Sequence, residues 1–387
     1  MKPVKTILSL LIILSNLFLL CGCWNYKDIE KSLLVAGFSI DKNEQGNKYL
    51  LTIELIDFEM SGKEAKQSSK FVETQGNTIF DAIRNAINIT GKKLYWAHAN
   101  LVIISGKVAE EGLAPVIDFI IRDAEMREEM YVLISEGKTA SEVLKQDVPV
   151  SQSSSDNIEN TIANQSSIGN FPSVHAYELV NTLEDEGIST YLPAIHLTES
   201  NGLKTAQVEG TAIFKSDKLI GFLDADETKT YLFIINKFKK GLITLKEDSS
   251  NNIDNVTLEV YNNKTKIKPV LSGKKLTMKI NIKTDVAIGE LGTQKDYIQD
   301  KKLRNKLQKD ADAKLKASAE SLIAKVQNDY NSDIFGFGKI IRANMPDIWK
   351  NSLKNEKNYF KDLNFDVTVN INVKNSALTL KPIEKGD

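Results

Sequence analysis

Few residues of this 387-residue chain have the type and spacing that chemistry at an active site requires. The three histidines, His98, His175 and His196, lie far apart, and none has a neighbour at the spacing typical of metal ligands. The best carboxylate cluster, Asp224-Ala225-Asp226-Glu227, lacks the loop length and the glycine of a calcium-binding hand. Its charges are better explained as favourable at the positive end of a helix dipole.

Nucleotide and nucleophile motifs are also missing from the sequence. The loop Ile334-Phe335-Gly336-Phe337-Gly338 lacks the preceding strand and the third glycine of a dinucleotide fingerprint. The chain has no Gly-x-Ser-x-Gly motif and no phosphate loop. We therefore expect a protein without catalytic residues, metal ligands or a cofactor.

The chain begins with the layout of an export signal. Lys2 and Lys5 precede an apolar run from Ile7 to Leu20, and the small residue Gly22 precedes Cys23. As a helix, this fourteen-residue run would reach ~21 Å, which is short of the ~30 Å hydrocarbon core of a bilayer. It makes a poor permanent span, so we expect residues 1–22 to be a signal peptide.

The segment Leu20-Cys21-Gly22-Cys23 resembles a bacterial lipobox, although Ala, Ser or Thr is more common where Cys21 stands. The resemblance implies cleavage after Gly22 and a diacylglyceryl thioether on Cys23. Two acyl chains give lasting attachment, because each buried methylene contributes ~0.8 kcal/mol. The alternative is an ordinary signal peptide with an unmodified cysteine. With Cys21 removed and Cys23 lipidated, no thiol remains for disulfides, metal ligation or catalysis.

The charge of the mature chain is nearly balanced. Loss of Lys2 and Lys5 reduces the 50 basic residues to 48 against 51 acidic residues, a net charge of −3. This balance suggests neither nucleic acid nor an electrostatic hold on anionic lipid, so attachment is expected to depend on the lipid. Trp24 and Tyr26 have two open interpretations, placement among lipid headgroups or packing on the domain.

Hydrophobic patterning in the first half of the chain predicts strands and helices in alternation, with helices covering a sheet. Pro115 either kinks the second helix or marks its start. The expected elements are a hairpin of residues 33–41 and 49–57, a helix at 77–93 closed by Gly91, a buried strand at 99–105, a helix at 108–123, a strand at 130–136, a short helix at 139–146, a loop at 149–171 with a weak helix near 156–165, and a helix at 173–187 capped by Ser173.

The second half predicts a hairpin at 207–223, a helix at 226–240, and strands at 276–283 and 365–374. Strict alternation in the last two strands indicates one buried and one wet face, hence a mostly antiparallel sheet. Between them, residues 296–330 predict a helix of ~50 Å. A long helix lying across the sheet is the simpler interpretation, and a helix that holds a partner protein is the alternative.

Together these patterns predict an α+β (mixed α/β) protein with several domains, in which mostly antiparallel or mixed sheets are covered by helices. We expect an N-terminal α/β domain at residues 23–200 and a C-terminal α+β domain at 201–387 with one long helix. The boundary is placed at the polar segment 199–202, and a further division near residues 245–255 stays open.

A series of short motifs runs through nearly the whole chain. They are Cys23-Trp24-Asn25, Gly37-Phe38-Ser39-Ile40-Asp41, His98-Ala99-Asn100, Phe119-Ile120-Ile121-Arg122-Asp123, Gly137-Lys138-Thr139-Ala140, Gly210-Thr211-Ala212-Ile213-Phe214-Lys215, Asp217-Lys218-Leu219-Ile220-Gly221, Asp333-Ile334-Phe335-Gly336-Phe337-Gly338 and Pro346-Asp347-Ile348-Trp349-Lys350. Each motif alone is weak. Their order, together with the lipobox, resembles the Ger(x)C lipoproteins, the C subunits of nutrient germinant receptors in bacterial spores.

The resemblance implies a lipoprotein on the outer face of the spore's inner membrane, assembled with two polytopic membrane subunits. Such a complex responds to amino acids, sugars or nucleosides and triggers the release of ions and dipicolinate. The resemblance also implies a three-domain α/β arrangement and no enzymatic activity. It transfers one functional residue, the lipidated Cys23, and no ligand-binding residue.

Three classes of function are compared. The first is the assembly subunit of a receptor, and the alternative is a lipid-tethered solute-binding protein that captures a small nutrient directly. Solute-binding proteins usually have two doubly wound lobes, against which the alternating strands at 276–283 and 365–374 argue. The third class, an exported enzyme, is disfavoured because the sequence lacks the residue patterns of catalytic and metal sites. Nucleic acid is not expected as a partner.

Overall fold

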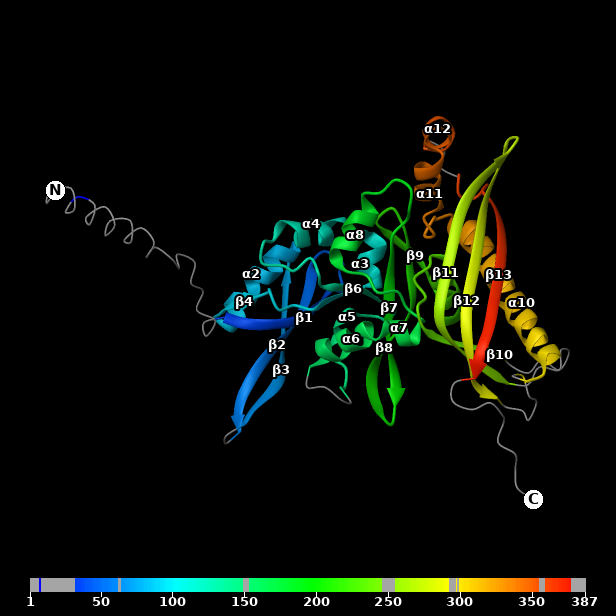
Figure 1. The fold of residues 1–387 in the computed structure, drawn as a ribbon. Helices are drawn as coiled ribbons and strands as arrows, with labels where there is room; N and C mark the ends of the chain where they lie inside the picture. The colour runs from blue at the N-terminus through cyan, green and yellow to red at the C-terminus, as the bar shows by residue number, and fades with distance from the viewer. Residues whose placement is uncertain are drawn as a thin grey trace, which may run out of the picture.

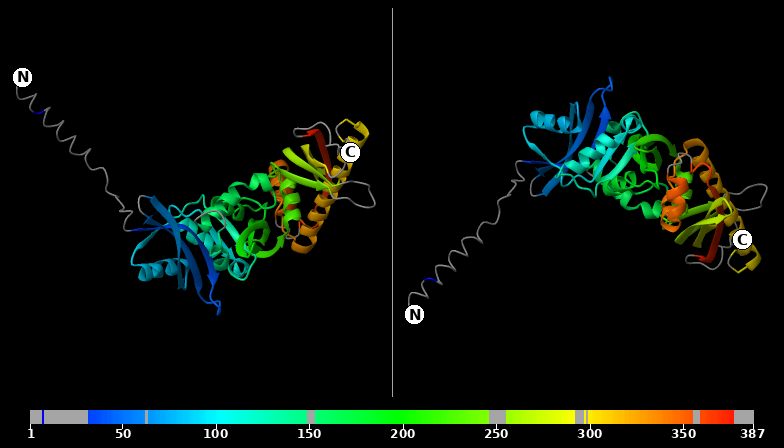
Figure 2. Two further views of the ribbon diagram at one scale, coloured as in Figure 1. Left: turned by 90° about the horizontal axis from the view of Figure 1, so that it is seen from below. Right: turned by 90° about the horizontal axis from the view of Figure 1, so that it is seen from above.

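The computed structural model of the chain describes residues 7, 32–61, 64–148, 153–245, 255–291, 297, 299–354 and 359–376. Cys23 and the predicted signal peptide, apart from Ile7, lie outside these residues, so the anchor stays a prediction. The described elements form two sheets with their helices, side by side along an elongated molecule (Figures 1 and 2). In these ranges no helix is both long and apolar enough to cross a membrane.

The first sheet has nine strands in the described part of the chain, in the order β3-β2-β1-β5-β6-β7-β8-β9, with β4 paired to β1. A parallel centre, β1-β5-β6-β7, is flanked by antiparallel strands on both sides. The strands are β1 (Ser32–Lys42), β2 (Tyr49–Ser61), β3 (Glu64–Gly76), β4 (Lys93–Tyr95), β5 (Leu101–Ser105), β6 (Tyr131–Ser135), β7 (Tyr191–Ser200), β8 (Leu203–Lys215) and β9 (Lys218–Leu223). The predicted hairpin β1–β2 is confirmed, whereas β3 and β4 were not predicted.

Helices cover both faces of this sheet (Figure 1). On β5, Val102 and Ile104 pack with one group of helices, whereas Leu101 and Ile103 pack with the other. The first group is α2 (Ile79–Thr90), α3 (Gly106–Glu111), α4 (Ala114–Arg122) and α8 (Ala176–Leu183), and the second includes α5 (Ala140–Leu144) and α6 (Ser154–Ala163), followed by α7 (Gln165–Ile168). Such burial on both faces agrees with the central strand that the sequence predicts.

The helix boundaries settle two predictions about helix starts and confirm one about a helix end. Pro115 lies in the first turn of α4, so it marks a start and not a kink. The last helix before β7 begins after His175 and not after Ser173, because residues 174 and 175 are still extended along β6. Gly91 ends α2 in the left-handed conformation, as predicted.

Two buried carboxylates hold helices against the sheet. Asp41 accepts hydrogen bonds from the amides of Ala140 and Ser141 at 2.8 and 3.0 Å. Glu54 accepts bonds from the amides of Ser154 and Ser155, both at 2.8 Å. Negative charge is favourable at helix starts, so these contacts fix α5 and α6. They explain why the weak helix predicted near residues 156–165 is a well-packed helix, α6, in an otherwise polar segment.

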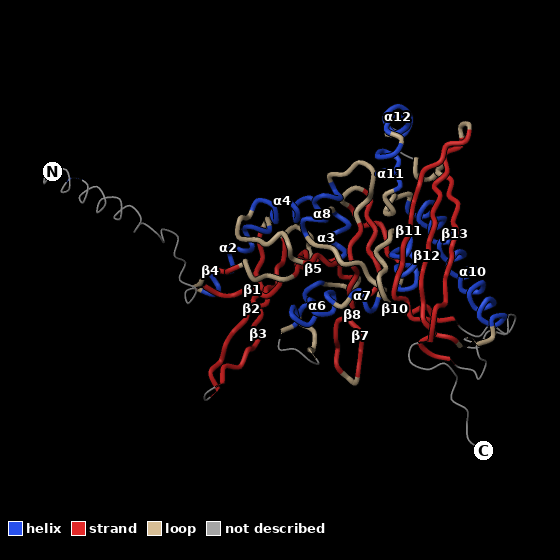
Figure 3. The backbone as a smooth tube through the Cα atoms, viewed as in Figure 1, coloured by secondary structure: helices blue, strands red, loops and turns tan. Residues whose placement is uncertain are grey.

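The second sheet has the order β10-β11-β12-β13, shown in red beside its helix in Figure 3. Its strands are β10 (Gly241–Leu245), β11 (Val256–Ser272), β12 (Lys275–Leu291) and β13 (Asn364–Ser376). All pairs are antiparallel except β12–β13, which is parallel. The long helix is confirmed as α10 (Lys301–Lys325), which continues as a π-helical turn, Val326–Tyr330.

One face of α10 packs on this sheet, and the simpler interpretation of the long helix is therefore confirmed. Leu307, Ala311, Leu315, Ala319 and Ile323 are buried and belong to the same core as the apolar faces of β11, β12 and β13. Side chains of α10 also reach the edge strand β13, where Asp312 and Gln308 accept bonds from the amides of residues 371 and 373.

The two sheets do not divide at the segment 199–202. This segment holds the turn between β7 and β8, which are antiparallel neighbours in the first sheet. The chain leaves the first sheet after Leu223, passes through α9 (Ala225–Ile234) and enters the second sheet at Gly241. Residues 246–254 lie outside the described residues, but the strands on either side of them, β10 and β11, pair in one sheet. The strands predicted at 207–223 as the start of the second domain therefore belong to the first sheet, because β8 is hydrogen-bonded to β7 and β9 to β8.

Candidate functional site

The three histidines are not brought together. His98 is exposed, His175 lies between Tyr131 and Tyr177 with ring centroids 4.4 and 5.5 Å away, and His196 has Nδ1 3.8 Å from Glu136. Among the described residues, no group of three His, Cys, Asp or Glu side chains is arranged to hold a metal ion.

The carboxylates at residues 224–227 form a helix start, as predicted. The Asp224 side chain accepts a bond from the Glu227 amide, and the Glu227 side chain accepts one from the Asp224 amide. This capping box satisfies amides that the helix itself leaves unpaired. Glu227 also pairs with Lys325 at 2.6 Å, and the Asp226 side chain is 97% exposed. The carboxylates therefore point to different partners.

The glycine-containing loop after α10 joins the two sheets. We call residues 184–190 and 330–342 the junction. The Ser189 amide donates to the Asp333 carbonyl at 2.8 Å, and the Lys339 amide donates to the Gly187 carbonyl at 2.7 Å. The Ser332 hydroxyl donates to the Phe214 carbonyl at 2.6 Å. The loop is thus a structural connection and not a phosphate-binding motif.

Asp333 is the centre of the junction. Its carboxylate is buried and accepts bonds from the amides of Phe337 and Gly338, at 3.1 and 2.7 Å, and from the Tyr359 hydroxyl at 3.0 Å. Burial raises the pKa of Asp333 to about 6, although these donors act in the opposite direction. Burial and the neighbouring Asp333 charge raise the pKa of the Tyr359 hydroxyl well above its usual range.

Close backbone contact at the junction depends on glycine. A Cβ on Gly338 would lie 2.5 Å from the Tyr359 hydroxyl and 3.0 Å from the Gly187 carbonyl oxygen. Gly336 has φ +72°, and the helix α11 (Phe337–Asn344) begins directly after it. Both glycines belong to the Asp333–Gly338 motif, so this motif has a structural role at the junction.

Charged side chains close the junction on its outer side. Asp185 lies 3.3 Å from Lys339 and 2.9 Å from Arg342. Burial raises the pKa of Asp185, but the Gly187 amide and the two cations outweigh it and hold this pKa below its ordinary value. Sequence reasoning missed the roles of Asp185 and Asp333, although a single acidic residue in an apolar, glycine-containing run was a usable signal for Asp333.

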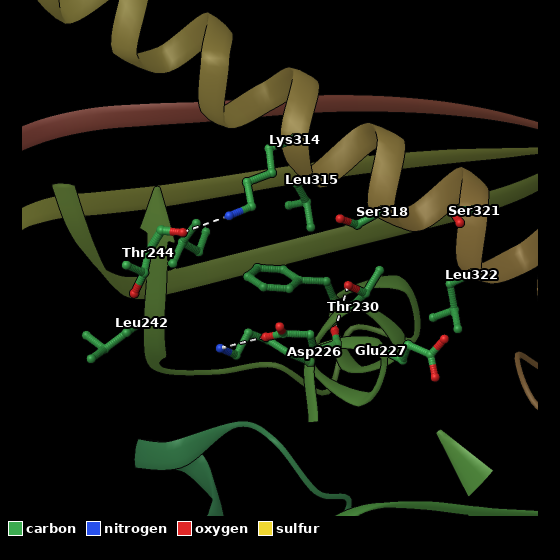
Figure 4. A pocket seen from close by; sticks show the side chains of 13 residues that line it. Asp226, Glu227, Thr230, Leu242, Thr244, Lys314, Leu315, Ser318, Ser321 and Leu322 are labelled. Atoms are coloured by element: carbon green, nitrogen blue, oxygen red, sulfur yellow. Dashed lines mark hydrogen bonds and ion pairs between the residues drawn. The ribbon is translucent and has the colours of Figure 1, made fainter. Parts of the chain in front are cut away.

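A pocket of about 260 Å³ lies between α9, β10 and α10 (Figure 4). Leu315, Ser318 and Leu322 of α10 face residues at the start of α9, including Asp226 and Thr230. Interactions hold both ends of the pocket: Lys325 pairs with Glu227, and Lys314 donates to the Thr244 carbonyl at 2.8 Å. These two lysines are ~16 Å apart along the helix axis.

The pocket lining is electrically neutral. Asp226 and Glu227 contribute two carboxylates, and Lys229 and Lys314 contribute two ammonium groups. The floor is apolar, with Phe233 and Leu315 among its residues. Such a lining suits a small polar molecule without net charge, but no catalytic arrangement of nucleophile and base lies among these residues.

Comparisons with known proteins identify the class. The family model described as spore germination protein N-terminal domain matches residues 25–197, and the model described as spore germination B3/GerAC-like, C-terminal, matches residues 209–377. The chain is 25% identical to spore germination protein B3 of Bacillus subtilis (strain 168) over 96% of this chain and 98% of that protein. It is 26% identical to spore germination protein A3 of the same organism, over 92% and 94%.

A solved structure supports the same fold. The crystal structure of the GerBC protein superposes with a TM-score of 0.55 at 22% identity, covering 87% of this chain and 96% of that chain. Fold and matches together define a two-part spore germination protein. The chain belongs to the Ger(x)C family.

Proposed function

We propose that this chain is a lipid-anchored, non-enzymatic subunit of a spore nutrient germinant receptor. The diacylglyceryl group on Cys23 would hold it on the outer face of the spore's inner membrane, where it assembles with two polytopic subunits and couples nutrient sensing to germination. The observation that carries this proposal is the match of both family models along the chain, directly after Cys23.

The described structure is consistent with a scaffold role. The best candidate chemical groups are used internally, since Asp333 joins the two sheets and Asp224 caps a helix. Asp41 and Glu54 hold helices in the same way. These buried carboxylates stabilise the fold and do not line a catalytic site. This use fits a subunit that couples its partners better than it fits an enzyme.

Substitution of Cys23 tests the anchor. Cys23→Ser removes the thiol that the lipid requires, so we expect the protein to leave the membrane fraction of spores and germination with nutrients to fall. Cys21→Ser is the matched control, because this residue leaves with the leader and serine is common at that lipobox position. Membrane retention and normal germination of Cys23→Ser would contradict the proposal.

Co-purification tests the assembly. Solubilised spore inner membrane should yield this chain together with two polytopic proteins, and the yield should fall in the Cys23→Ser strain. Recovery of the lipidated chain alone, under conditions that keep other membrane complexes intact, would contradict an assembled receptor.

Direct capture of a nutrient is a second candidate function, favoured by the neutral pocket between α9 and α10. Its test is calorimetry of the protein with amino acids, sugars and nucleosides. Ser318→Trp should abolish binding by filling the pocket, whereas Lys316→Ala on the outer side of α10 should not. Absence of saturable binding to the unsubstituted protein would reject this second function and leave the first intact.

A further inference from the structure

The long hairpin β11–β12 carries a concentrated positive charge. Between Glu259 and Asp285 the chain has seven lysines and no acidic residue. All seven side chains are exposed. We call them the hairpin lysines: Lys264, Lys266, Lys268, Lys274, Lys275, Lys279 and Lys283. The nearly balanced total charge of the chain conceals this local excess.

The register places like charges opposite one another. Lys264 lies across from Lys283, and Lys268 lies across from Lys279. Like charges directly opposite on one face of a sheet are destabilising. In the described part of the chain, no salt bridge joins a hairpin lysine to a carboxylate, and Asp285, two residues after Lys283, pairs with Lys374 instead. Asp366 of β13 lies across from Lys279 and offsets the repulsion there, but Lys283 faces Asn370. The Lys264–Lys283 pair therefore costs stability, and packing alone does not explain it.

Apolar side chains are exposed at the tip of the same hairpin. Val270 is 37% exposed and Leu271 is 46% exposed, although both are large enough to pack in a core. Lys274 and Lys275 follow them across the turn, in which Gly273 has φ +60°. The tip projects beyond the rest of the second sheet (Figure 1). It therefore presents an apolar end surrounded by ammonium groups.

We propose that the β11–β12 tip docks on an anionic lipid bilayer, with Val270 and Leu271 in the interfacial region and the hairpin lysines against lipid phosphates. A bilayer offers both a plane of negative charge and an apolar layer beneath it. Nucleic acid or polyphosphate would match the charge but would leave the two apolar side chains in water. The combination favours lipid.

The contact adds a second point of attachment. Docking of the tip rests on the proposed function in one respect: the lipid on Cys23 brings the rest of the protein to a membrane. The first strand begins at the end of the molecule far from the β11–β12 tip (Figure 1). Contact at both ends would therefore lay the long axis along the bilayer. One attachment raises the effective concentration for the other, so a modest hairpin affinity is sufficient.

The test uses the full, lipidated chain in vesicles. Leu271→Cys receives an environment-sensitive fluorophore, and the thioether at Cys23 leaves position 271 as the one reactive thiol. Vesicles of phosphatidylcholine alone are compared with equal parts of phosphatidylcholine and phosphatidylglycerol. We expect brighter, blue-shifted emission with phosphatidylglycerol, and its loss in high salt.

A charge variant gives the magnitude. Each lysine near an anionic surface contributes about fivefold to the docking equilibrium, so the triple variant Lys268→Gln, Lys274→Gln and Lys275→Gln should reduce the ratio of docked to undocked tips roughly a hundredfold. Lys301→Gln, Lys302→Gln and Lys309→Gln remove the same charge near the start of α10, at the far end of the sheet, and should have no effect. Circular dichroism checks that both variants fold.

Three results would overturn the proposal. The emission could be equal on both vesicle types, both triple variants could lose it equally, or a soluble polyanion such as heparin could bind the hairpin while phosphatidylglycerol leaves the tip in water. Failure of the anchor is seen separately, because an unlipidated Cys23 would take up a second fluorophore, which mass spectrometry detects.

Discussion

The buried carboxylate of Asp333 makes the stability of the protein depend on pH in an unusual direction. Its pKa is about 6 in the folded protein and 3.8 in the unfolded chain, so between these values the folded state binds more protons. The free energy of unfolding therefore falls as the pH rises from about 4 to above 6. The difference corresponds to about 3 kcal/mol.

Asp333→Asn removes this titration, and urea unfolding at several pH values measures the result. The stability of the unsubstituted protein relative to Asp333→Asn should fall by about 2 kcal/mol between pH 4 and pH 7, because part of the full change already occurs below pH 4. Comparing the two proteins at each pH cancels the other titrating groups. Asp185→Asn is an opposite control: the pKa of Asp185 is lowered, so its contribution is present above pH 4 and is lost as the pH falls. The reasoning would be refuted if the free energy of unfolding of the unsubstituted protein, minus that of Asp333→Asn, stays constant or increases as the pH rises.

Three further substitutions test packing and charge. Lys268→Glu places a carboxylate directly across from Lys279. Thermal unfolding should then show stabilisation by ~0.2–1 kcal/mol, and docking on anionic vesicles should weaken. Destabilisation would contradict the repulsion between Lys268 and Lys279. Gly338→Ala forces a methyl group against the junction and should lower the free energy of unfolding in urea by ~1–3 kcal/mol. Gly289→Ala is the control and should be nearly neutral, because its new Cβ would lie 3.5 Å from its nearest neighbour. Glu54→Gln leaves the amides that begin α6 without their anionic partner and should lower the free energy of unfolding by ~1–3 kcal/mol. Amide hydrogen exchange should then be faster in α6 than in α2. Equal exchange in the two helices would contradict the role assigned to Glu54.

Periodicity predicted the elements whose burial is one-sided or complete. The α10 stripe and the alternating strands β12 and β13 were clear because each buries one face against the same core. The β5 strand was clear because both of its faces are covered. In contrast, β3 is an edge strand with many polar residues, and the three-residue β4 is too short for a periodic signal.

Features that depend on pairing between distant segments were not predictable. The sequence at residues 199–202 marks a turn, but only hydrogen bonding shows that the turn joins two strands of one sheet. The role of Asp333 depends on donors up to 26 residues away, including Tyr359. The hairpin lysines were hidden by the near-zero total charge, since a sum over the chain carries no information on where the charges lie.

The central claim is that lipid on Cys23 holds this body on the spore membrane. Mass spectrometry of the N-terminal peptide, taken from the natural protein in spore inner membrane, tests it most directly. The account predicts a mature chain that begins at Cys23 with a diacylglyceryl group on its sulfur. A chain that retains residues 1–22, or one that begins at Cys23 with an unmodified thiol, would contradict it.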